Sequence, residues 1–442
     1  MPDTDPSLFT HMKVLIVNTS ESSGGAAVAA RRLMDALELN GVQTTMLVRD
    51  KQSDDERVVA LPHLWLAKWH FLWERLVLFV RLHFHYRNLF AIDAGVSGTD
   101  ITRLRVFRQA DVVHLHWVNQ GMLSLSDIRK IVRSGKPVVW TMHDIWPATS
   151  LCHLSLECRQ FTRRGADSRT SGCRQCPYLP GGGSDNDYSS RVWRKKQKML
   201  AGSNITFVAC SRWLQGEAKA SALLDRQLTA SIPNAIDTEL FSPGSGEEAR
   251  RQESLPLDRK LVLFVCQKVT NRYKGMDYLI EACRLMAAEH PATKAEVSVV
   301  LLGSHADEVA EQLPFPALAL GYVSDQQRMA RLYRAADVFV LPSLSENLPN
   351  TIMEAMACGL PCLGFRVGGI PEEIDHRRTG YVARYRDAAD LAQGLHWLLY
   401  EADRQRLAEE AVKKVQKCYS PTSVAVQYTE IYQQTMIQTT MK

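Results

Sequence analysis

Short apolar runs rich in Val and Ile recur along the first half of the chain, separated by stretches in which apolar residues have helical spacing. Continuous apolar runs of this kind are typical of parallel strands that are covered on both faces. They predict a doubly wound sheet with strands at residues 14–18, 44–48, 112–117, 138–141 and 205–209.

The same rhythm begins again after the Pro- and Gly-bearing stretch at 241–246. It predicts a second α/β domain of the same kind, with strands at 261–265, 297–302, 338–341 and 361–365. The expected order is a disordered lead-in at 1–11, an N-terminal Rossmann-like domain at 12–240, a second at 241–420, and a helix within 421–442 that packs back on the first domain. Ligands of such sheets bind at the carboxyl ends of the strands, so we expect the two sheets to face each other across an interdomain cleft.

Composition narrows the function classes. Of the 442 residues, 45% are hydrophobic and 23% are charged, as in ordinary globular proteins. The net charge of +5 (53 Lys and Arg, 48 Asp and Glu) is too small to indicate a nucleic-acid partner. The polar N-terminus does not resemble a signal peptide, so we expect a cytoplasmic protein with reduced cysteines.

The strongest chemical signal follows the expected strand at 338–341. A loop leads into a helix that begins near Asn350, and helix starts of this kind bind phosphate through free backbone N–H groups. Glu346 in the loop is placed to accept hydrogen bonds from sugar hydroxyls, and Glu354 inside the helix is placed to accept those of a ribose. The spacing alone fits equally a loop cap and a solvated helix residue.

The wider sequence favours the functional interpretation. The segment Glu346-Asn-Leu-Pro-Asn-Thr-Ile-Met-Glu354, followed by Ala-Met-Ala-Cys-Gly-Leu-Pro361, Gly368-Gly-Ile-Pro-Glu-Glu373 and Thr379-Gly-Tyr381, closely resembles the signature of glycosyltransferase family 4. The resemblance extends from residue 12 to about residue 432. It implies the GT-B fold, with two Rossmann-like domains, and transfer with retention of the anomeric configuration.

By this resemblance, each motif residue acquires an expected role. Glu346 contacts the donor sugar, Glu354 binds the ribose, and the backbone amides of Asn350 and Thr351 bind the phosphates. Lys274 matches the family lysine that neutralises the leaving diphosphate, and a lysine at a surface helix start is the plain alternative.

The resemblance leaves other donor contacts open. Where the family commonly has Gly-Arg, this chain has Cys266-Gln-Lys268, so either Lys268 or Arg272 is the second phosphate cation. Val323, in the loop after Gly321, is expected near the nucleotide base. Nothing in the sequence identifies the base or the sugar.

In the first domain, Gly24 and Gly25 open a helix of small residues after the first strand. The dinucleotide fingerprint GxGxxG and a Walker lysine are both missing, which argues against dehydrogenases and NTPases. His143, at the end of the strand at 138–141, matches the family histidine that lines the reaction centre. His114 and His116 are expected to point to opposite faces of their strand, one packed and one near the cleft, rather than to form a metal pair.

Four cysteines, Cys152, Cys158, Cys173 and Cys176, follow His143 in the order C-x5-C-x14-C-x2-C within an insertion at 148–180. Four thiolates are a common ligand set of structural zinc, so the spacing predicts a zinc knuckle, with a redox pair or free buried thiols as alternatives. The insertion also resembles a segment of colanic-acid-type exopolysaccharide glycosyltransferases. No cofactor is expected to be required for catalysis itself.

Residues 64–90 combine Trp65, Trp69 and Trp73 with other aromatic and basic residues. Charged residues interrupt the segment, which argues against a transmembrane helix. The pattern suits a helix lying on a membrane surface, at the inner face of the cytoplasmic membrane, and equally a helix buried against the sheet or a partner subunit.

These features together predict a retaining hexosyltransferase that moves a sugar from a nucleotide-diphosphate sugar to a hydroxyl of a lipid-linked saccharide in exopolysaccharide or capsule biosynthesis. The alternatives are a sugar-nucleotide epimerase or phosphorylase on the same fold, and a non-catalytic sugar-nucleotide-binding scaffold subunit. Catalytic roles are expected for His143, Lys274 and Glu346.

Overall fold

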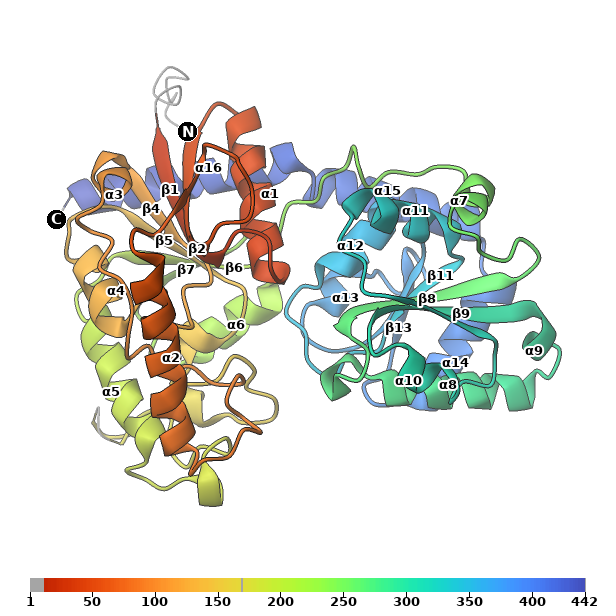
Figure 1. Cartoon of the computed structure of the whole chain (residues 1–442), viewed down its shortest axis with the longest axis horizontal. Coiled ribbons are helices and arrows are strands. Elements are labelled where there is room, and N and C mark those ends of the chain that lie inside the picture. Colours follow the sequence, from red (N-terminus) through yellow and green to blue (C-terminus); the bar gives the residue numbers. More distant parts are fainter. Residues whose placement is uncertain (1–11, 168–169, 442) are drawn as a thin grey trace. The chain divides into compact units, whose positions relative to one another are not determined.

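The computed structural model describes residues 12–167 and 170–441, so the expected lead-in at 1–11 lies outside the described residues. The described residues form two compact units, one within 12–235 together with 424–441, and one at 236–423. The boundaries expected from the sequence, 240/241 and 420/421, lie a few residues from these divisions. Each unit contains one parallel sheet with helices packed on it (Figure 1).

The first unit contains a seven-stranded sheet in the order β3-β2-β1-β4-β5-β6-β7, and every neighbouring pair is parallel. Its strands are β1 (Lys13–Ser20), β2 (Gln43–Asp50), β3 (Val58–Ala60), β4 (Val112–Leu115), β5 (Val138–Met142), β6 (Ile205–Ala209) and β7 (Leu228–Ser231). The helices are α1 (Gly25–Leu39), α2 (Leu64–Arg81), α3 (Arg105–Gln109), α4 (Leu125–Val132), α5 (Tyr188–Leu200), α6 (Arg212–Ala220) and, from Val424 onward, α16 (Pro421–Thr440).

Alternate residues of the central strands bury into two separate hydrophobic clusters, as the two-residue period of a strand requires. Leu15 and Val17 of β1 belong to one cluster, whereas Val14 and Ile16 belong to the other. The second cluster also contains Tyr428 and Tyr432 of α16. The C-terminal helix therefore completes the core on one face of the first sheet.

The second unit contains a six-stranded parallel sheet in the order β10-β9-β8-β11-β12-β13. Its strands are β8 (Lys260–Lys268), β9 (Val297–Ser304), β10 (Ala317–Gly321), β11 (Val338–Leu341), β12 (Cys362–Phe365) and β13 (Gly380–Ala383). The helices are α7 (Gly246–Gln252), α8 (Met276–Glu289), α9 (Thr293–Glu296), α10 (Asp307–Ala310), α11 (Gln326–Ala335), α12 (Asn350–Ala357), α13 (Ile370–Glu373), α14 (Ala388–His396), continued by a π-turn at Trp397–Glu401, and α15 (Arg404–Cys418).

The prediction of two doubly wound α/β domains is confirmed, and each strand expected from the sequence is present. Strands β3, β7, β10 and β13 were not predicted, and these four are the edge strands of the two sheets. An edge strand pairs on one side only, so its sequence shows a weaker apolar pattern and is harder to recognise. In both sheets the order of the strands along the chain reverses, between β1 and β4 and between β8 and β11, and such switch points are where parallel sheets bind ligands.

Replacing Tyr432 by Phe tests the attachment of α16. The hydroxyl of Tyr432 lies 2.8 Å from Nδ1 of His114, and both residues are fully buried. Its removal leaves a buried imidazole nitrogen without a partner, so we expect the free energy of unfolding of the first unit to fall by about 1–3 kcal/mol. Urea unfolding followed by tryptophan fluorescence measures this, because every tryptophan except Trp397 lies in the first unit. The exposed Ile437 on the same helix gives a control, Ile437→Ala, which should leave the transition unchanged.

Replacing Glu373 by Leu tests a buried acid in the second unit. Glu373 is 0% exposed, and neither of its carboxyl oxygens has a hydrogen-bond partner among the described residues. Burial, with the nearby charge of Glu346, raises the pKa of Glu373 well above 4.5. Between pH 4.5 and the folded pKa the unfolded state releases the proton first, so this group destabilises the fold increasingly as pH rises.

Glu373→Leu should therefore raise the melting temperature, and the gain should be larger at neutral pH than at pH 4.5. Differential scanning calorimetry at the two pH values measures both effects. Glu372→Gln, at the partly exposed neighbouring position, is the control and should show no such pH-dependent gain. An equal gain at both pH values would contradict the assignment of a buried, protonated Glu373.

Candidate functional site

Two expected donor residues are in contact at the switch point of the second sheet, between β8 and β11. Lys274 follows β8 in a short 3-10 turn, and Glu346 follows β11 in the loop before α12. The ammonium group of Lys274 forms an ion pair with the carboxylate of Glu346, which also accepts a hydrogen bond of 2.9 Å from Ser343. The Glu346 side chain is 12% exposed. A cation and an anion are thus held together at the carboxyl end of the sheet.

Glycines bring these loops into contact. Gly275 has φ of +74°, and a Cβ atom there would lie 1.8 Å from the carbonyl oxygen of Pro342. Gly368 has φ of +56°, and its Cβ would lie 1.8 Å from the carbonyl oxygen of Glu346. Both positions therefore require glycine, and the Gly-Gly-Ile-Pro motif fixes the backbone that carries Glu346.

Helix α12 supplies the other expected donor residues. Asn350 and Thr351 are its first two residues, and the N-cap is Pro349, whose ring offers the helix start no hydrogen-bond acceptor. Glu354 is 8% exposed, and one of its oxygens accepts a hydrogen bond of 3.0 Å from the hydroxyl of Tyr333. The sequence did not predict Tyr333 as this partner, because Tyr333 lies on another helix, α11, where its position indicates only an ordinary buried helix residue.

The remaining expected donor residues are Lys268, Arg272 and Val323. Lys268 ends β8 with an exposed side chain, and Arg272 is exposed over the ring of Tyr273, 5.6 Å from its centroid. Val323 follows β10, which is two strands from β8 in the sheet. Of the three candidate cations, Lys274 is the one that contacts Glu346.

In the first unit, the loop after β1 leads to an exposed helix start. Gly24 is the N-cap of α1 with φ of +91°, and Gly25 is the first helical residue. The loop is held by Glu21, which accepts hydrogen bonds from the backbone of Gln52 and Ser53, at 2.6 and 2.9 Å. The backbone N–H groups at this helix start therefore lie at the switch point of the first sheet.

His143 directly follows β5 and belongs to a row of polar side chains at the ends of neighbouring strands. Its Nε2 atom lies 2.9 Å from Nδ1 of His116, and its Nδ1 lies 3.6 Å from the sulfur of Cys210. Burial lowers the pKa of His143 to about 4 and that of His116 well below its usual value. Both imidazoles are therefore neutral near pH 7, and the N–H of one donates a hydrogen bond to the other.

The expectation that His114 and His116 point to opposite faces is wrong. Their ring centroids are 4.2 Å apart, because residues two positions apart in a strand share a face. His114 is packed against Thr141 and Tyr432, whereas His116 contacts His143.

A buried charge network behind His143 was missed by the sequence analysis. Asp144 accepts hydrogen bonds from Trp117 at 2.9 Å and from His153 at 2.7 Å, and the other ring nitrogen of His153 lies 3.3 Å from Asp93. Burial lowers the pKa of His153, but the two carboxylates outweigh it and raise that pKa to about 9. His153 is thus a cation at neutral pH, unlike His143.

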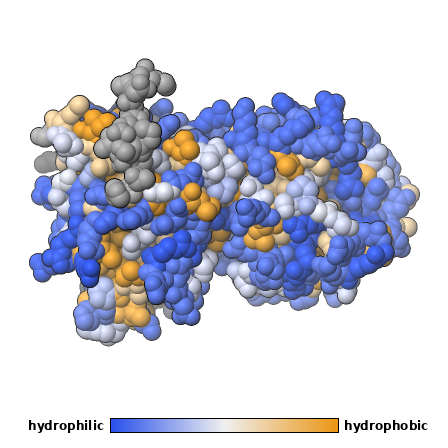
Figure 2. Space-filling view, turned by 90° about the horizontal axis from the view of Figure 1, so that it is seen from above, coloured by the Kyte–Doolittle hydropathy of each residue, from blue (hydrophilic) through white to orange (hydrophobic). Residues whose placement is uncertain are grey.

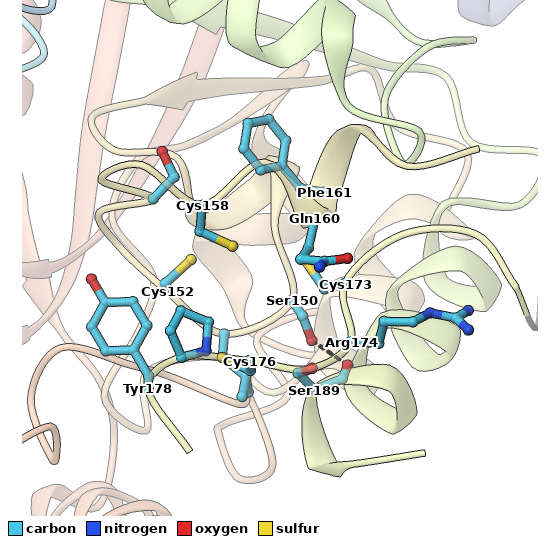
Figure 3. Close-up of a pocket in the computed structure, with 13 residues that line it drawn as sticks. Ser150, Cys152, Cys158, Gln160, Phe161, Cys173, Arg174, Cys176, Tyr178 and Ser189 are labelled. Carbon is cyan, nitrogen blue, oxygen red and sulfur yellow. Dashed lines mark hydrogen bonds between the residues drawn. The ribbon is translucent and has the colours of Figure 1, made fainter. Parts of the chain in front are cut away.

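The four cysteines of the insertion lie around one pocket, together with Phe161 and Tyr178 (Figure 3). The side chains of Cys152 and Cys158 point toward each other in that view. Burial raises the pKa of Cys152 to about 11 and that of Cys176 to about 12, and all ten cysteines of the chain are free thiols. Within residues 12–167 and 170–441, no three His, Cys, Asp or Glu side chains form a ready-made metal site.

Comparison with known proteins gives the family context of this arrangement. Residues 23–240 match the model of Glycosyltransferase Family 4, and residues 259–401 match the model of Glycosyl transferases group 1. The chain is 34% identical over 193 residues to a D-inositol 3-phosphate glycosyltransferase of Nocardiopsis dassonvillei, which is 41% of this chain and 44% of that protein. A Corynebacterium aurimucosum protein of the same name is 32% identical over 217 residues, 46% of this chain and 51% of its own. The chain thus spans about half the length of the curated relatives it matches.

Solved structures resemble the chain over nearly its whole length. Sucrose-phosphate synthase from Thermosynechococcus elongatus has a TM-score of 0.65 at 19% identity, over 96% of this chain and 98% of that one. HepE from Anabaena, solved with UDP and glucose, has a TM-score of 0.62 at 16% identity, over 96% and 100%. At these identities the likeness shows the fold. The solved structures show that the fold of the chain is the GT-B fold. The two family models together span most of the chain and show that it is a glycosyltransferase with a Family 4 domain followed by a group 1 domain.

Proposed function

We propose that the chain is a retaining hexosyltransferase that transfers a sugar from a nucleotide-diphosphate sugar to a hydroxyl of a lipid-linked saccharide in exopolysaccharide or capsule biosynthesis. The observation that carries the proposal is the Lys274–Glu346 ion pair at the switch point of the second sheet, beside the start of α12. A diphosphate at this helix start would be near both the backbone N–H groups of Asn350 and Thr351 and the Lys274 cation. The neighbour HepE, solved with UDP-glucose, supports a nucleotide sugar as donor.

The proposed reaction breaks the bond between the anomeric carbon and the diphosphate oxygen and forms a bond to the acceptor oxygen on the same face. The acceptor proton passes to the departing phosphate. Lys274 stabilises the negative charge that develops on that phosphate. We expect this electrostatic stabilisation to supply the larger part of the rate enhancement. Glu346 is neutralised by Lys274 and hydrogen-bonded by Ser343, which supports a sugar-binding role rather than that of a covalent nucleophile.

The other site residues complete the proposal. Glu354, oriented by Tyr333, binds the ribose, and Val323 lies toward the base. Lys268 or Arg272 supplies a second cation for the diphosphate. By the family resemblance, we assign His143, neutral and hydrogen-bonded with His116, to the reaction centre, and Gly24 and Gly25 to the donor phosphates. The resemblance of the cysteine insertion to exopolysaccharide enzymes supports the acceptor class.

Donor binding and catalysis can be separated by two variants. A thermal-shift panel of UDP-, GDP- and ADP-sugars should show one donor that raises the melting temperature of the wild type. Glu354→Ala should abolish this shift, because the ribose loses its acceptor. Lys274→Ala should keep part of the shift but lower donor turnover by about 10²–10³-fold, as loss of one charge-stabilising group does.

Lys413→Ala, which removes an exposed lysine of α15 in the same unit, is the matched control and should behave as wild type. NMR of the anomeric signal of the product tests retention. Donor binding without turnover in the wild type would favour the scaffold alternative, and wild-type turnover by Lys274→Ala would overturn the assigned role of this lysine.

We also propose that the cysteine insertion binds structural zinc. The support is chemical: all four thiols of the insertion line one pocket. Burial raises the pKa of the Cys152, Cys173 and Cys176 thiols, so a cation is needed to hold these groups as thiolates. Between the 3-10 turn at Trp146–Ala148 and α5, the described residues form only short turns, so the segment has little regular structure of its own. Side-chain rotation would have to bring the sulfurs to the metal.

Elemental analysis of the purified chain tests the zinc proposal. We expect about one zinc per chain, lost in Cys173→Ser/Cys176→Ser together with a lower melting temperature of the first unit. Cys283→Ser, which removes a buried cysteine of α8 in the second unit, is the control and should retain the metal. A metal-free wild type with full activity would contradict the proposal.

A further inference from the structure

Helix α2 is inverted relative to an ordinary surface helix. Its outward side is largely apolar, with a stripe of side chains that are 47–63% exposed: Trp65, Trp69, Leu72, Trp73, Leu76 and Val80. The side of the molecule that faces the viewer in Figure 1, where α2 lies, forms the lower edge of Figure 2, and hydrophobic residues gather there at the lower left. A soluble surface helix normally presents its polar residues in this direction.

The inward face of α2 explains why the helix cannot turn round. Glu74 is 0% exposed and accepts hydrogen bonds of 2.9–3.3 Å from the backbone N–H groups of residues 94–97. Arg75 is also buried and forms a 2.6 Å ion pair with Asp93. Rotating the apolar stripe inward would turn Glu74 and Arg75 toward solvent and leave the buried Asp93 carboxylate and four amides without partners, a cost that opposes the gain from burial. The exposed apolar stripe is therefore a fixed feature of the fold.

The apolar surface continues past the helix and carries positive charge. Phe84, Tyr86 and Phe90 are 62–74% exposed. Three cations of the same segment are exposed: Lys68, Arg81 and Arg87. The one acidic residue in 64–90 is the buried Glu74, so this segment presents cations and tryptophans without a carboxylate of its own. We call residues 64–90 the aromatic-basic face.

We infer that the aromatic-basic face docks on the surface of an anionic lipid bilayer. Tryptophan side chains favour the headgroup level, and basic residues are attracted to anionic lipids. A protein partner is less well matched, because lysine is depleted at the centre of protein interfaces and Lys68 lies between Trp65 and Trp69. No helix in residues 12–167 and 170–441 is long and apolar enough to cross a membrane, so α2 would lie along the surface. The inference rests on the proposed function only in that a lipid-linked acceptor gives such docking a purpose.

Vesicle flotation of the full chain tests the inference. The wild type should float with vesicles of phosphatidylcholine and phosphatidylglycerol, and more weakly with phosphatidylcholine alone. Trp65→Ser/Trp69→Ser/Trp73→Ser and, separately, Lys68→Glu/Arg87→Glu should each weaken binding to the anionic vesicles by at least about tenfold. The matched control Leu39→Ser/Leu156→Ser/Leu228→Ser removes three exposed leucines elsewhere on the same unit and should float as the wild type does.

Other outcomes would overturn the inference. No flotation of the wild type, or equal flotation of the triple tryptophan variant, excludes a bilayer as the occupant. If sedimentation instead shows a wild-type dimer that the tryptophan variant converts to a monomer, a second copy of the chain covers this face. Donor hydrolysis in solution keeps the two proposals apart: it should be unchanged in the tryptophan variant, and its absence in the wild type would count against the proposed function alone.

Discussion

Asp93 joins the segments on which the first unit's distinctive features depend. Its carboxylate is 1% exposed and is shared between Arg75 of α2, at 2.6 Å, and His153 of the insertion, at 3.3 Å. His153 in turn donates to Asp144, the residue after His143. Removing one partner from a buried pair of this kind typically costs about 3–5 kcal/mol, because the other charge remains buried. The direction of α2, the position of the insertion and the end of β5 are therefore set together.

This network has a different electrostatic character from the histidines next to it. His153 is kept protonated by two carboxylates, whereas His116 and His143 are kept neutral by burial. The second unit shows the same separation of environments. Lys274 and Glu346 neutralise each other in a partly exposed loop, while Glu373 is buried with its pKa raised. In both units polar groups gather at the carboxyl ends of the strands: His143 and Asp144 follow β5, and Lys274 and Glu346 follow β8 and β11. This is the edge at which parallel sheets of this kind bind their ligands.

The central strands could be predicted because each is covered on both faces and so reads as a continuous apolar run. The edge strands β7 and β10 could not, because pairing on one side leaves them partly exposed and weakens their apolar pattern. The edge strands β3 and β13 are only three and four residues long, which is too short for a clear pattern. The motif around Glu346 was recognisable from sequence because its chemistry is local to one strand, loop and helix. The contacts of His143 were not, since His116 and Cys210 come from neighbouring strands that are 27 and 67 residues away. Asp93 and Asp144 are separated in sequence by α3, β4, α4 and β5. No local sequence motif indicates that both contact His153.

The segment 64–90 shows why a hydrophobic pattern alone does not decide between a buried helix and an exposed one. Its apolar residues surround the helix on most sides, so periodicity favours neither direction. The deciding residues are Glu74 and Arg75, which in most amphipathic helices would mark the solvent side. Here the backbone amides of residues 94–97 need the Glu74 carboxylate, and Asp93 needs Arg75. The tryptophans are thereby turned outward by the polar requirements of the interior, and the exposed aromatic-basic face follows from the same ion pairs that hold the end of β5.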